Sequence, residues 1–245
     1  MAFRPQPEPP AAVDRPVMYM GWQELAYLHW RYPAASVDRL LPDGVRAETF
    51  DGSAWVGLIP FSMDRIRFPG LPVVPYVSTF PETNVRTYVV DRSGRRGIWF
   101  FSLDVNRLLP AAVARLTYRL PYCWGPMAIE RRGDRIRYTG TRRWPRPRAG
   151  SEVEVEVGSR IAERDVDELG HFLTAAWGLY STFGPRLVWA PVDHPRWPLH
   201  EAEVVHVRED LVTAAGLPEP TGEPVVHWSP GVRVRVGRPT RVVSP

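Results

Sequence analysis

The chain of 245 residues contains no lysine, and all 31 of its basic side chains are arginine. Lysine is normally among the commonest residues, and the chain also has only two asparagines, Asn84 and Asn106. A GC-rich genome, which replaces lysine codons with arginine codons, accounts for both shortages. Whatever their origin, no side-chain amine is present to form a Schiff base. Arginine cannot replace lysine in that role because its guanidinium stays protonated.

Cysteine is almost as scarce, since Cys123 is the only one. A single thiol excludes an intrachain disulfide and gives no zinc-binding spacing. It fits a reducing compartment, and we expect the protein to be cytoplasmic. Asp193-His194 and His200 follow no recognised metal-ligand spacing, so we expect neither a metal nor a cofactor.

Long apolar runs are also missing. No segment approaches the roughly 18 apolar residues of a membrane span, and the proline-rich first ten residues lack the apolar core of a signal peptide. We therefore predict a flexible arm over residues 1–16, followed by one domain over residues 17–245 that is long enough to bury a sizeable core.

The net charge of +4 is spread along the chain. Its densest basic cluster is Arg142-Arg143-Trp-Pro-Arg146-Pro-Arg148, whose prolines predict a solvated surface loop. Because no nucleic-acid-binding module surrounds this cluster, we expect neither a nucleic-acid nor a membrane partner.

Prolines and glycines divide the chain into short segments, which predicts an α+β, β-rich fold with a few helices. Expected strands are 22–31, 53–61, 86–90, 97–103, 127–132, 135–141, 151–157, 199–207 and 232–236. Turn residues predict hairpins between 90 and 97 and at Gly133-Asp134. The strict Glu/Val alternation of residues 151–157 predicts a strand with one buried face and one acidic face in water.

Three helices are expected. Residues 34–41 lie between Pro33 and Pro42, which occupy helix-boundary positions. A second short helix covers residues 107–116, where Pro110 is tolerated only in the first turn. The longest covers residues 165–182, because an apolar stripe of helical period runs along it through Leu169, Phe172, Leu173, Ala176, Trp177 and Tyr180.

Two stretches carry a family resemblance: Glu82-Thr-Asn-Val-Arg86-Thr-Tyr-Val with Gly97-Ile-Trp99-Phe-Phe-Ser-Leu-Asp104, and Ala114-Arg115-Leu-Thr-Tyr-Arg-Leu-Pro121-Tyr122. Four shorter motifs accompany them: His29-Trp30, Leu41-Pro42, Trp55-Val-Gly-Leu-Ile-Pro-Phe61 and His194-Pro-Arg-Trp-Pro-Leu199. With these motifs the chain resembles the YqjF-like family of uncharacterised proteins over nearly its whole length, from Met20 to Gly237.

More distantly, the order of these landmarks is similar to that of acetoacetate decarboxylase. The resemblance implies a closed β-barrel with a central cavity and a few flanking helices. In the decarboxylases a proline precedes two lysines, one of which forms the Schiff base, whereas here Pro121 precedes Tyr122 and Cys123. Their substrate-binding arginine falls near Gln23, and their cavity glutamate falls on Glu82. The resemblance therefore carries over the fold and not the decarboxylation mechanism.

Glu82 and Arg86 lie four residues apart on a predicted strand, so their side chains share one face. If that face lines a cavity, Glu82 is a candidate general base and Arg86 a candidate clamp for a carboxylate or oxyanion. Alternatively, the two form an internal ion pair. Tyr122 is a candidate general acid or hydrogen-bond donor to a carbonyl, and packing against the barrel wall is its alternative.

The candidate substrate-binding residues are Gln23, Arg115, Cys123, His29 and Trp99. Arg115 can bind an anionic ligand or balance Glu82 or Asp104. Cys123 is a nucleophile only if a neighbour lowers its pKa, and a buried inert thiol is its alternative. For His29, a hydrogen-bonded structural role is the alternative. The ten tryptophans and nine phenylalanines suit a flat organic ligand, or simply fill a core.

Two functional hypotheses follow. The first is an enzyme that acts on a carbonyl- or carboxylate-bearing organic molecule by non-covalent acid–base chemistry of the lyase, cyclase or hydrolase type. It would use Glu82, Arg86 and Tyr122. The second is a protein that binds or sequesters a small hydrophobic or aromatic ligand without chemistry, since no complete catalytic constellation is evident. In both, the partner is a small organic molecule, and a homo-oligomer is compatible with either. Fold analogy alone does not decide between them.

Overall fold

The computed structural model describes residues 6–107 and 120–242, and over these ranges fourteen strands form one hydrogen-bonded sheet. Few and short helices accompany it, so the predicted β-rich fold is confirmed. The strands are β1 Met18–Tyr32, β2 Val45–Ala47, β3 Ala54–Arg67, β4 Phe80–Asp91, β5 Arg96–Val105, β6 Tyr122–Trp124, β7 Met127–Arg132, β8 Arg135–Thr141, β9 Gly150–Arg160, β10 Gly178–Phe183, β11 Arg186–Asp193, β12 His200–Glu209, β13 Val225–Val236 and β14 Thr240–Arg241. The helices are α1 Ala34–Asp38, α2 Pro75–Ser78, α4 Glu168–Thr174 and α5 Leu211–Ala214, with a 3₁₀ turn at Glu163–Asp165.

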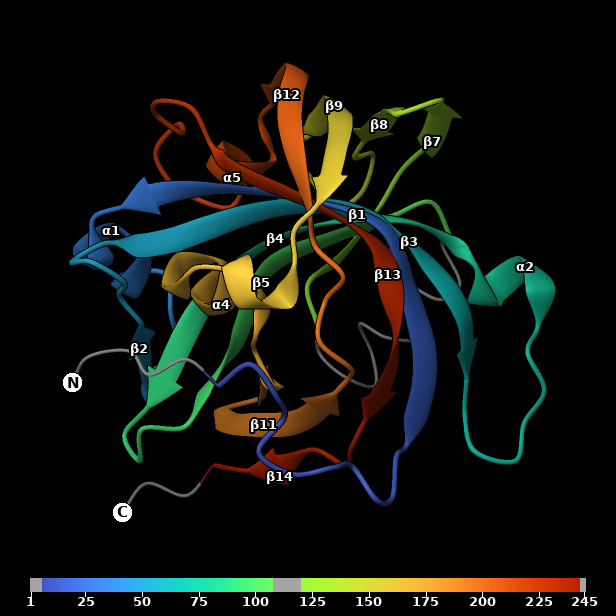
Figure 1. The fold of residues 1–245 in the computed structure, drawn as a ribbon. Coiled ribbons are helices and arrows are strands. Elements are labelled where there is room, and N and C mark those ends of the chain that lie inside the picture. The colour runs from blue at the N-terminus through green and yellow to red at the C-terminus, as the bar shows by residue number, and fades with distance from the viewer. Residues whose placement is uncertain (1–5, 108–119, 243–245) are drawn as a thin grey trace.

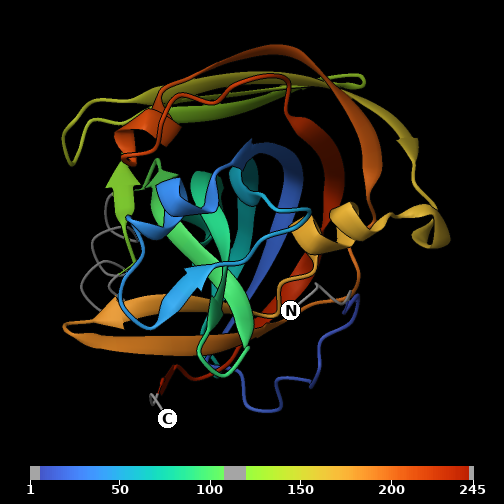
Figure 2. The same ribbon diagram turned by 90° about the vertical axis from the view of Figure 1, so that its left-hand side faces the viewer.

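The strand pairings run in the order β11-β10-β5-β4-β3-β1-β13, and β11 pairs with β13 as well as with β10. All of these pairings are antiparallel except that of β10 with β5. Beyond β13 the sheet continues through β12, β9, β8 and β7, which lie at the top of the molecule in Figure 1 and arch over the other strands in Figure 2. The described helices include none long and apolar enough to cross a membrane.

The two faces of the central strands enter different cores. On β1, Leu28 and Trp30 pack with Ile136 of β8 and Val153 of β9 in one hydrophobic cluster. The neighbouring Tyr27 belongs to a second cluster, formed by residues from β1, β3, β11 and β13. Because side chains alternate along a strand, each central strand serves both cores. We call the side that holds Tyr27 the inner face and the side covered by β8 and β9 the outer face.

Both predicted hairpins are confirmed, since β4 pairs with β5 and β7 with β8, each antiparallel. Strand β9 is also as expected, because Val153 and Val155 are fully buried and the alternating glutamates of the strand lie on the other face. Helix α1 ends at Asp38, three residues earlier than predicted.

The helix predicted over residues 165–182 is wrong. Helix α4 ends at Thr174, and residues 178–183 form strand β10. The apolar period is real as far as Ala176, because Leu169, Phe172, Leu173 and Ala176 all join one cluster. Tyr180 instead pairs with Trp99 of β5 and Trp189 of β11. Long-range strand pairing therefore overrides the local helical pattern.

The segment before β1 contacts the body of the protein at several points. The Trp177 indole donates to the carbonyl of Gln6, at 2.7 Å. The backbone amide of Val13 donates to Asp193, also at 2.7 Å. The Arg196 guanidinium contacts Glu8 at 3.1 Å. The flexibility expected of residues 1–16 stays a prediction. The helix expected over residues 107–116 lies almost entirely outside the described residues.

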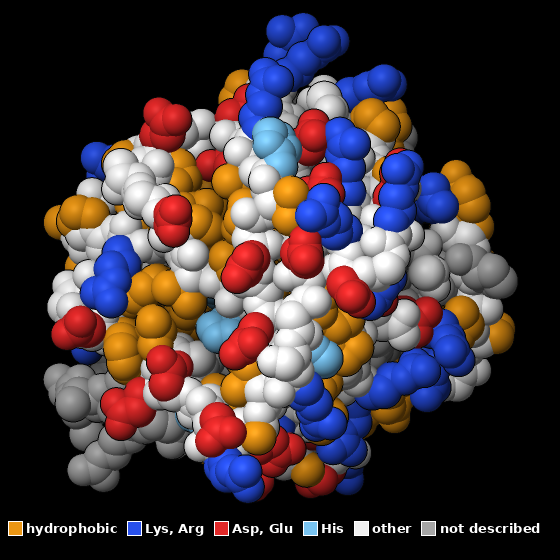
Figure 3. Space-filling view, turned by 45° about the horizontal axis from the view of Figure 1, so that its top comes forward, with side chains coloured by type: hydrophobic (Ala, Val, Ile, Leu, Met, Phe, Trp, Pro, Cys, Tyr) orange, Lys and Arg blue, Asp and Glu red, His pale blue; other side chains and the backbone are white. Residues whose placement is uncertain are grey.

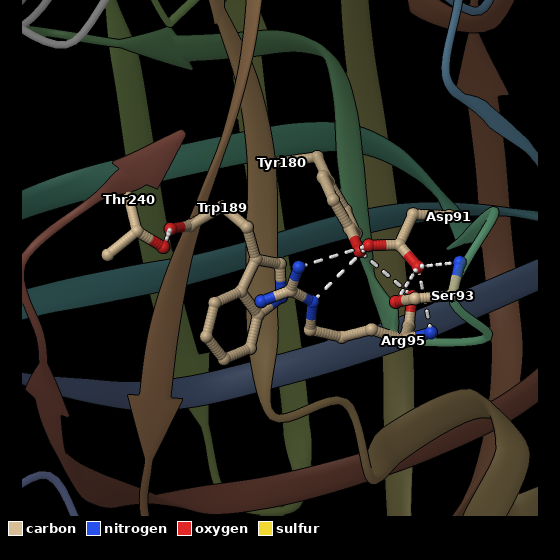
Figure 4. A network of polar contacts seen from close by, with 6 residues as sticks. All are labelled: Asp91, Ser93, Arg95, Tyr180, Trp189 and Thr240. Atoms are coloured by element: carbon tan, nitrogen blue, oxygen red, sulfur yellow. Dashed lines mark hydrogen bonds and ion pairs between the residues drawn. The ribbon is translucent and has the colours of Figure 1, made fainter. Parts of the chain in front are cut away.

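A polar network fixes the tip of the β4–β5 hairpin (Figure 4). Asp91 accepts hydrogen bonds from the Ser93 amide and hydroxyl and from the Arg95 amide, and it forms an ion pair with the Arg95 guanidinium. That guanidinium also lies over the Trp189 ring, 4.7 Å from its centroid. Burial raises the pKa of Asp91, but these hydrogen bonds outweigh it and hold that pKa below its usual value. The network joins the hairpin to β11.

A buried ion pair connects β5 to the end of β8. Arg142 donates from Nε and Nη2 to the two carboxylate oxygens of Asp104, at 2.7 Å each, and both residues are less than 7% exposed. Burial opposes the charge of Arg142, but the hydrogen bond and charge of Asp104 outweigh it and raise the pKa of the guanidinium. The predicted solvated loop at residues 142–148 is therefore wrong at its first arginine, which is a core residue.

Breaking this pair from one side should be costly. Asp104→Asn leaves the Arg142 charge buried without its counter-ion, so the free energy of unfolding should fall by about 3–5 kcal/mol. Urea denaturation measures the change. The matched control is Glu152→Gln, which breaks an ion pair with Arg137 whose side chains are 48% and 38% exposed, and it should change stability by less than about 1 kcal/mol. Equal effects of the two substitutions would contradict the assignment.

Candidate functional site

A row of polar side chains follows the inner face of β4. Glu82, Asn84, Arg86 and Tyr88 alternate along the strand, so they share one face. The cross-strand partners of the first three on β3 are Phe61, Ile59 and Gly57. All four β4 residues are at most 6% exposed. Glu82 and Arg86 lie about 13 Å apart along the strand, from the usual rise of about 3.3 Å per residue.

Glu82 supplies the carboxyl group of this row, and its pKa is strongly raised. It is 2% exposed, and its Oε2 has no hydrogen-bond partner among the residues that the structure describes. Burial first, and then the negative charge of Asp104, raise its pKa to about 8, while a hydrogen bond with Asn84 opposes the rise. Arg86 is not among the described groups that act on this pKa. Glu82 therefore holds its proton through most of the neutral pH range.

Arg86 lies at the other end of the row and contacts helix α4. Its Nη2 donates to the Tyr88 hydroxyl at 3.2 Å and to the carbonyl of Leu173 at 3.4 Å. Its guanidinium also lies over the Tyr27 ring, 5.5 Å from the centroid. Within the described chain its Nε has no hydrogen-bond partner. A buried cation with an unused donor is suited to binding a carboxylate.

His29 completes this end of the site. It is fully buried, and its Nε2 lies 2.8 Å from the Tyr88 hydroxyl, which itself donates to the carbonyl of Leu173. Burial, followed by the positive charges of Arg86 and His227, holds the pKa of His29 well below its ordinary value, so the imidazole is neutral. Opposite it on β3, a Cβ atom at Gly57 would come within 2.7 Å of Nε2. Glycine at this position makes room for the ring.

Tyr122 lies beside Glu82 on a different strand. Strand β6 runs parallel to β5, and the Tyr122 side chain packs against the same inner-face cluster as Tyr27. Burial first, and then the charge of Glu82, raise the pKa of Tyr122 well above its ordinary value. Its hydroxyl therefore stays protonated at neutral pH.

Three other predicted site residues lie elsewhere. Cys123 follows Tyr122 on β6 and so faces the other way; it is buried, with Sγ 3.5 Å from the carbonyl of Pro121. Gln23 is exposed and donates to Asp64 at 3.2 Å. Trp99 packs against the cluster of Val89, Tyr180 and Leu187, away from the inner face. Arg115 lies outside the described residues. The structure thus places Glu82 near Tyr122 and Arg86 near His29, at two separate points of the inner face.

Several inner-face residues were missed by the sequence analysis. Tyr88 and Asn84 are two of them, and the alternation through 82, 84, 86 and 88 was the signal that could have found them. Another group is an aromatic cluster of Trp22, Trp177, His194 and Trp197, whose ring centroids lie 4.5–6.0 Å apart in contacting pairs. Trp197 also meets the Tyr27 ring edge-on at 5.5 Å. Burial lowers the pKa of His194 to about 4, so this cluster is uncharged.

Metal ligands do not converge anywhere in the described chain, because no group of three or more His, Cys, Asp or Glu side chains is placed to hold an ion. The arrangement offers instead a weak acid (Glu82), a neutral phenol (Tyr122) and a buried cation (Arg86). Such groups suit proton transfer and the binding of carbonyl or carboxylate oxygens.

Comparison with solved structures places the fold. The chain is similar to an acetoacetate decarboxylase-like enzyme from Sphingomonas wittichii RW1, with a TM-score of 0.63 and 12% identity over 96% of each chain. It is also similar to the enduracididine biosynthesis enzyme MppR complexed with pyruvate, with a TM-score of 0.63 and 14% identity over 95% of this chain and 93% of that one. At such identities the likeness shows the fold alone.

Comparison of sequences places the family. The uncharacterized protein YqjF of Bacillus subtilis (strain 168) is 30% identical over 213 residues, which are 87% of either chain. The predicted resemblance to YqjF-like proteins is therefore confirmed. A family model described as an uncharacterized conserved protein, DUF2071, matches residues 19–233. This chain accordingly belongs to the DUF2071 family of uncharacterized conserved proteins.

Proposed function

We propose that this protein is an enzyme that acts on a carbonyl- and carboxylate-bearing organic molecule by acid–base chemistry, within a closed barrel whose cavity lies on the inner face. The observation that carries the proposal is the pairing of a buried Glu82, with a pKa raised to about 8, with the protonated hydroxyl of Tyr122 beside it. Carboxyl groups with a pKa shifted toward neutrality are the usual acids and bases of enzymes.

The strand pairings support the closed barrel. Because β11 pairs with β10 on one side and β13 on the other, the path through β5, β4, β3 and β1 returns to its start. Closing a sheet in this way leaves its inner-facing side chains away from water. The polar row of β4 lies on this side.

The roles follow from protonation. Since Glu82 holds its proton at neutral pH, it first acts as an acid toward a carbonyl or leaving-group oxygen, and it then acts as the base that recovers a proton. This differs from the resting general base expected from the sequence. The Tyr122 hydroxyl donates a hydrogen bond to the same oxygen and so stabilises developing negative charge. The proposed steps are non-covalent proton transfers, and no Schiff base can form because the chain has no lysine.

The spacing of the site suggests the size of the substrate. Arg86 contacts Tyr88 and Leu173, about 13 Å along β4 from Glu82. A carboxylate bound by Arg86 therefore reaches Glu82 and Tyr122 only through an extended molecule. The likeness to MppR, whose structure holds pyruvate, favours a 2-oxo acid, and the aromatic cluster favours one with a ring. Binding such a ligand without turnover is the second candidate, and the same aromatic surface favours it.

Turnover of 2-oxo and 3-oxo acids of increasing length, with and without an aryl group, tests the proposal. For the acid that reacts, Glu82→Gln should lower kcat by at least about a hundredfold, and Tyr122→Phe by roughly a hundredfold. Matched controls are Glu203→Gln and Tyr76→Phe, both at exposed positions, which should leave kcat unchanged.

Two outcomes would count against the enzyme. Unchanged turnover in both site variants would remove Glu82 and Tyr122 from the chemistry. A ligand that binds the wild-type protein and is recovered chemically unaltered after long incubation would favour the binding protein instead. Native mass spectrometry of freshly purified protein, followed by denaturation and extraction, identifies any ligand that is already bound.

The Glu82 pKa also predicts how stability depends on pH. A carboxyl group whose pKa is raised by folding does not lower the free energy of unfolding at pH values below its unfolded-state pKa, because both states then hold the proton. As pH rises from about 4.5 to about 8, the unfolded state loses its proton first, so the free energy of unfolding falls. Glu82→Gln removes this loss. Its stability relative to wild type should therefore rise across this window by on the order of a few kcal/mol and level off above it.

Urea denaturation of both proteins at intervals from about pH 4.5 to about pH 9 measures this difference. The Glu203→Gln control, at an exposed carboxyl, should track the wild type. A difference between Glu82→Gln and wild type that is independent of pH would show that Glu82 is already ionised in the folded protein.

A further inference from the structure

A second site is formed by arginines at one end of strands β3, β1 and β13. A cleft of about 800 Å³ lies there, lined by Arg65, Arg67, Arg233 and Arg235. This volume falls within the roughly 300–1,000 Å³ of small-molecule pockets. None of Glu82, Arg86 and Tyr122 lines it, so we call it the arginine cleft and treat it apart from the inner-face site.

Strand register explains why the arginines converge. Tyr19 of β1 pairs with Arg67 on one side and Arg235 on the other, so these three side chains share a face. Two residues further along, Gly21 pairs with Asp64 and Arg233. A Cβ atom at Gly21 would come within 3.3 Å of the Asp64 side chain, so glycine at this position leaves room for that carboxylate between the two rows. The three strands thus direct arginines from both sides toward one concave surface.

The charges of the cleft do not cancel. Asp193 forms an ion pair with Arg235, at 2.6 Å, and also accepts from the Val13 amide. Asp64 lies 3.3 Å from Arg65 and 3.7 Å from Arg233, so one carboxylate serves two cations. Four arginines therefore face two carboxylates, which leaves an excess of two positive charges.

Arg67 is the arginine of the cleft whose positive charge is least compensated. Its guanidinium lies over the Tyr19 ring, 4.2 Å from the centroid, and no acidic partner for it is found in residues 6–107 and 120–242. Stacking uses the flat face of a guanidinium and leaves the N–H donors at its edge available. Such an edge matches two oxygens of a phosphate group.

Much of the rest of the lining is apolar, and His194 also contributes to it. Pro9 and Ala12 of the N-terminal segment, Met20 of β1 and Val73 of the β3–α2 connection contribute to it. A phosphate ion alone leaves these groups in contact with water. A ligand that joins a phosphate to an apolar group uses both parts of the cleft.

We propose that the arginine cleft binds a small phosphorylated organic molecule, with the phosphate held by Arg67 and Arg233 and the organic part against Met20 and Val73. The shape of the cleft favours a small molecule over a nucleic-acid strand. Figure 3 shows arginines interspersed with acidic side chains over the face in view. In the cleft itself, Asp64 and Asp193 form ion pairs with three of the four arginines, so the cleft is not the continuous basic track that a nucleic-acid backbone requires.

Isothermal titration of the full-length protein with phenyl phosphate tests this proposal, in a buffer free of phosphate and sulfate. We expect saturable binding of one equivalent that is tighter than the binding of inorganic phosphate. Arg67→Gln and Arg233→Gln should each weaken it by roughly tenfold or more, as the loss of a charge-assisted hydrogen bond does. Arg132→Gln is the control, because it removes the same charge from a side chain that is 86% exposed on β7; it should change Kd less than twofold.

Three results would overturn the proposal: no saturable binding at millimolar phenyl phosphate, equal weakening by Arg67→Gln and Arg132→Gln, or binding of a single-stranded oligonucleotide in place of phenyl phosphate. Circular dichroism melting of each variant separates a binding defect from unfolding, and two binding variants are used so that one unstable protein does not end the test. Because Glu82→Gln leaves the cleft intact, it should bind phenyl phosphate like the wild type. The phenyl phosphate experiment can therefore fail without contradicting the proposed inner-face enzyme, and the enzyme can fail without contradicting the arginine cleft.

Discussion

The arrangement of the inner-face site depends on the buried ion pair of Asp104 and Arg142. Asp104 lies on β5, next to Cys123 of β6, and Arg142 follows β8 directly. Around the pair, Trp124 and Trp144 exchange backbone hydrogen bonds, and the Arg142 amide bonds to Ala149. The pair thereby fastens short strand β6 between the central strands and the layer of β8 and β9. Since Tyr122 begins β6, its position beside Glu82 follows from this outer-face contact.

The two faces of the sheet differ in the charges that surround their buried carboxyl groups. On the outer face, the Asp104 charge is matched by Arg142 at 2.7 Å. On the inner face, Glu82 has no such partner among the described residues, and burial together with Asp104 keeps it protonated. Strands β4 and β5 thus hold one carboxylate in an ion pair, that of Asp104, and keep one carboxyl group neutral, that of Glu82. Arg86, further along β4, is kept from Glu82 by the length of strand between them and is held by Tyr88 and Leu173.

Local patterns in the sequence predicted much of this structure, and contacts between distant residues account for what they missed. The turn residues at Gly133-Asp134 and after Asp91 predict their hairpins, because the conformation of a tight turn depends on the few residues that form it. Period-two spacing placed Glu82 and Arg86 on one face for the same reason. By contrast, Tyr180 continues a helical stripe, and only the pairing of β10 with β5 and β11 makes it a strand residue. Which face Trp99 and Cys123 occupy depends on strand register, with one irregularity in the β4–β5 pairing between Val85 and Arg86, and no single-sequence pattern reveals that. The burial of Arg142 likewise depends on Asp104, 38 residues away.

The protonated state of Glu82 has a consequence for anything that enters the inner face. A ligand that brings negative charge close to this carboxyl strengthens its hold on the proton, whereas a ligand that brings positive charge releases it. Binding and proton exchange with the solvent are then one coupled equilibrium. Near pH 8, where the carboxyl titrates, an anion can enter together with a proton and so arrive with less net charge than it has in water. Under the proposed function, an acid is thus taken up together with a proton, with no fixed positive charge next to the carboxyl.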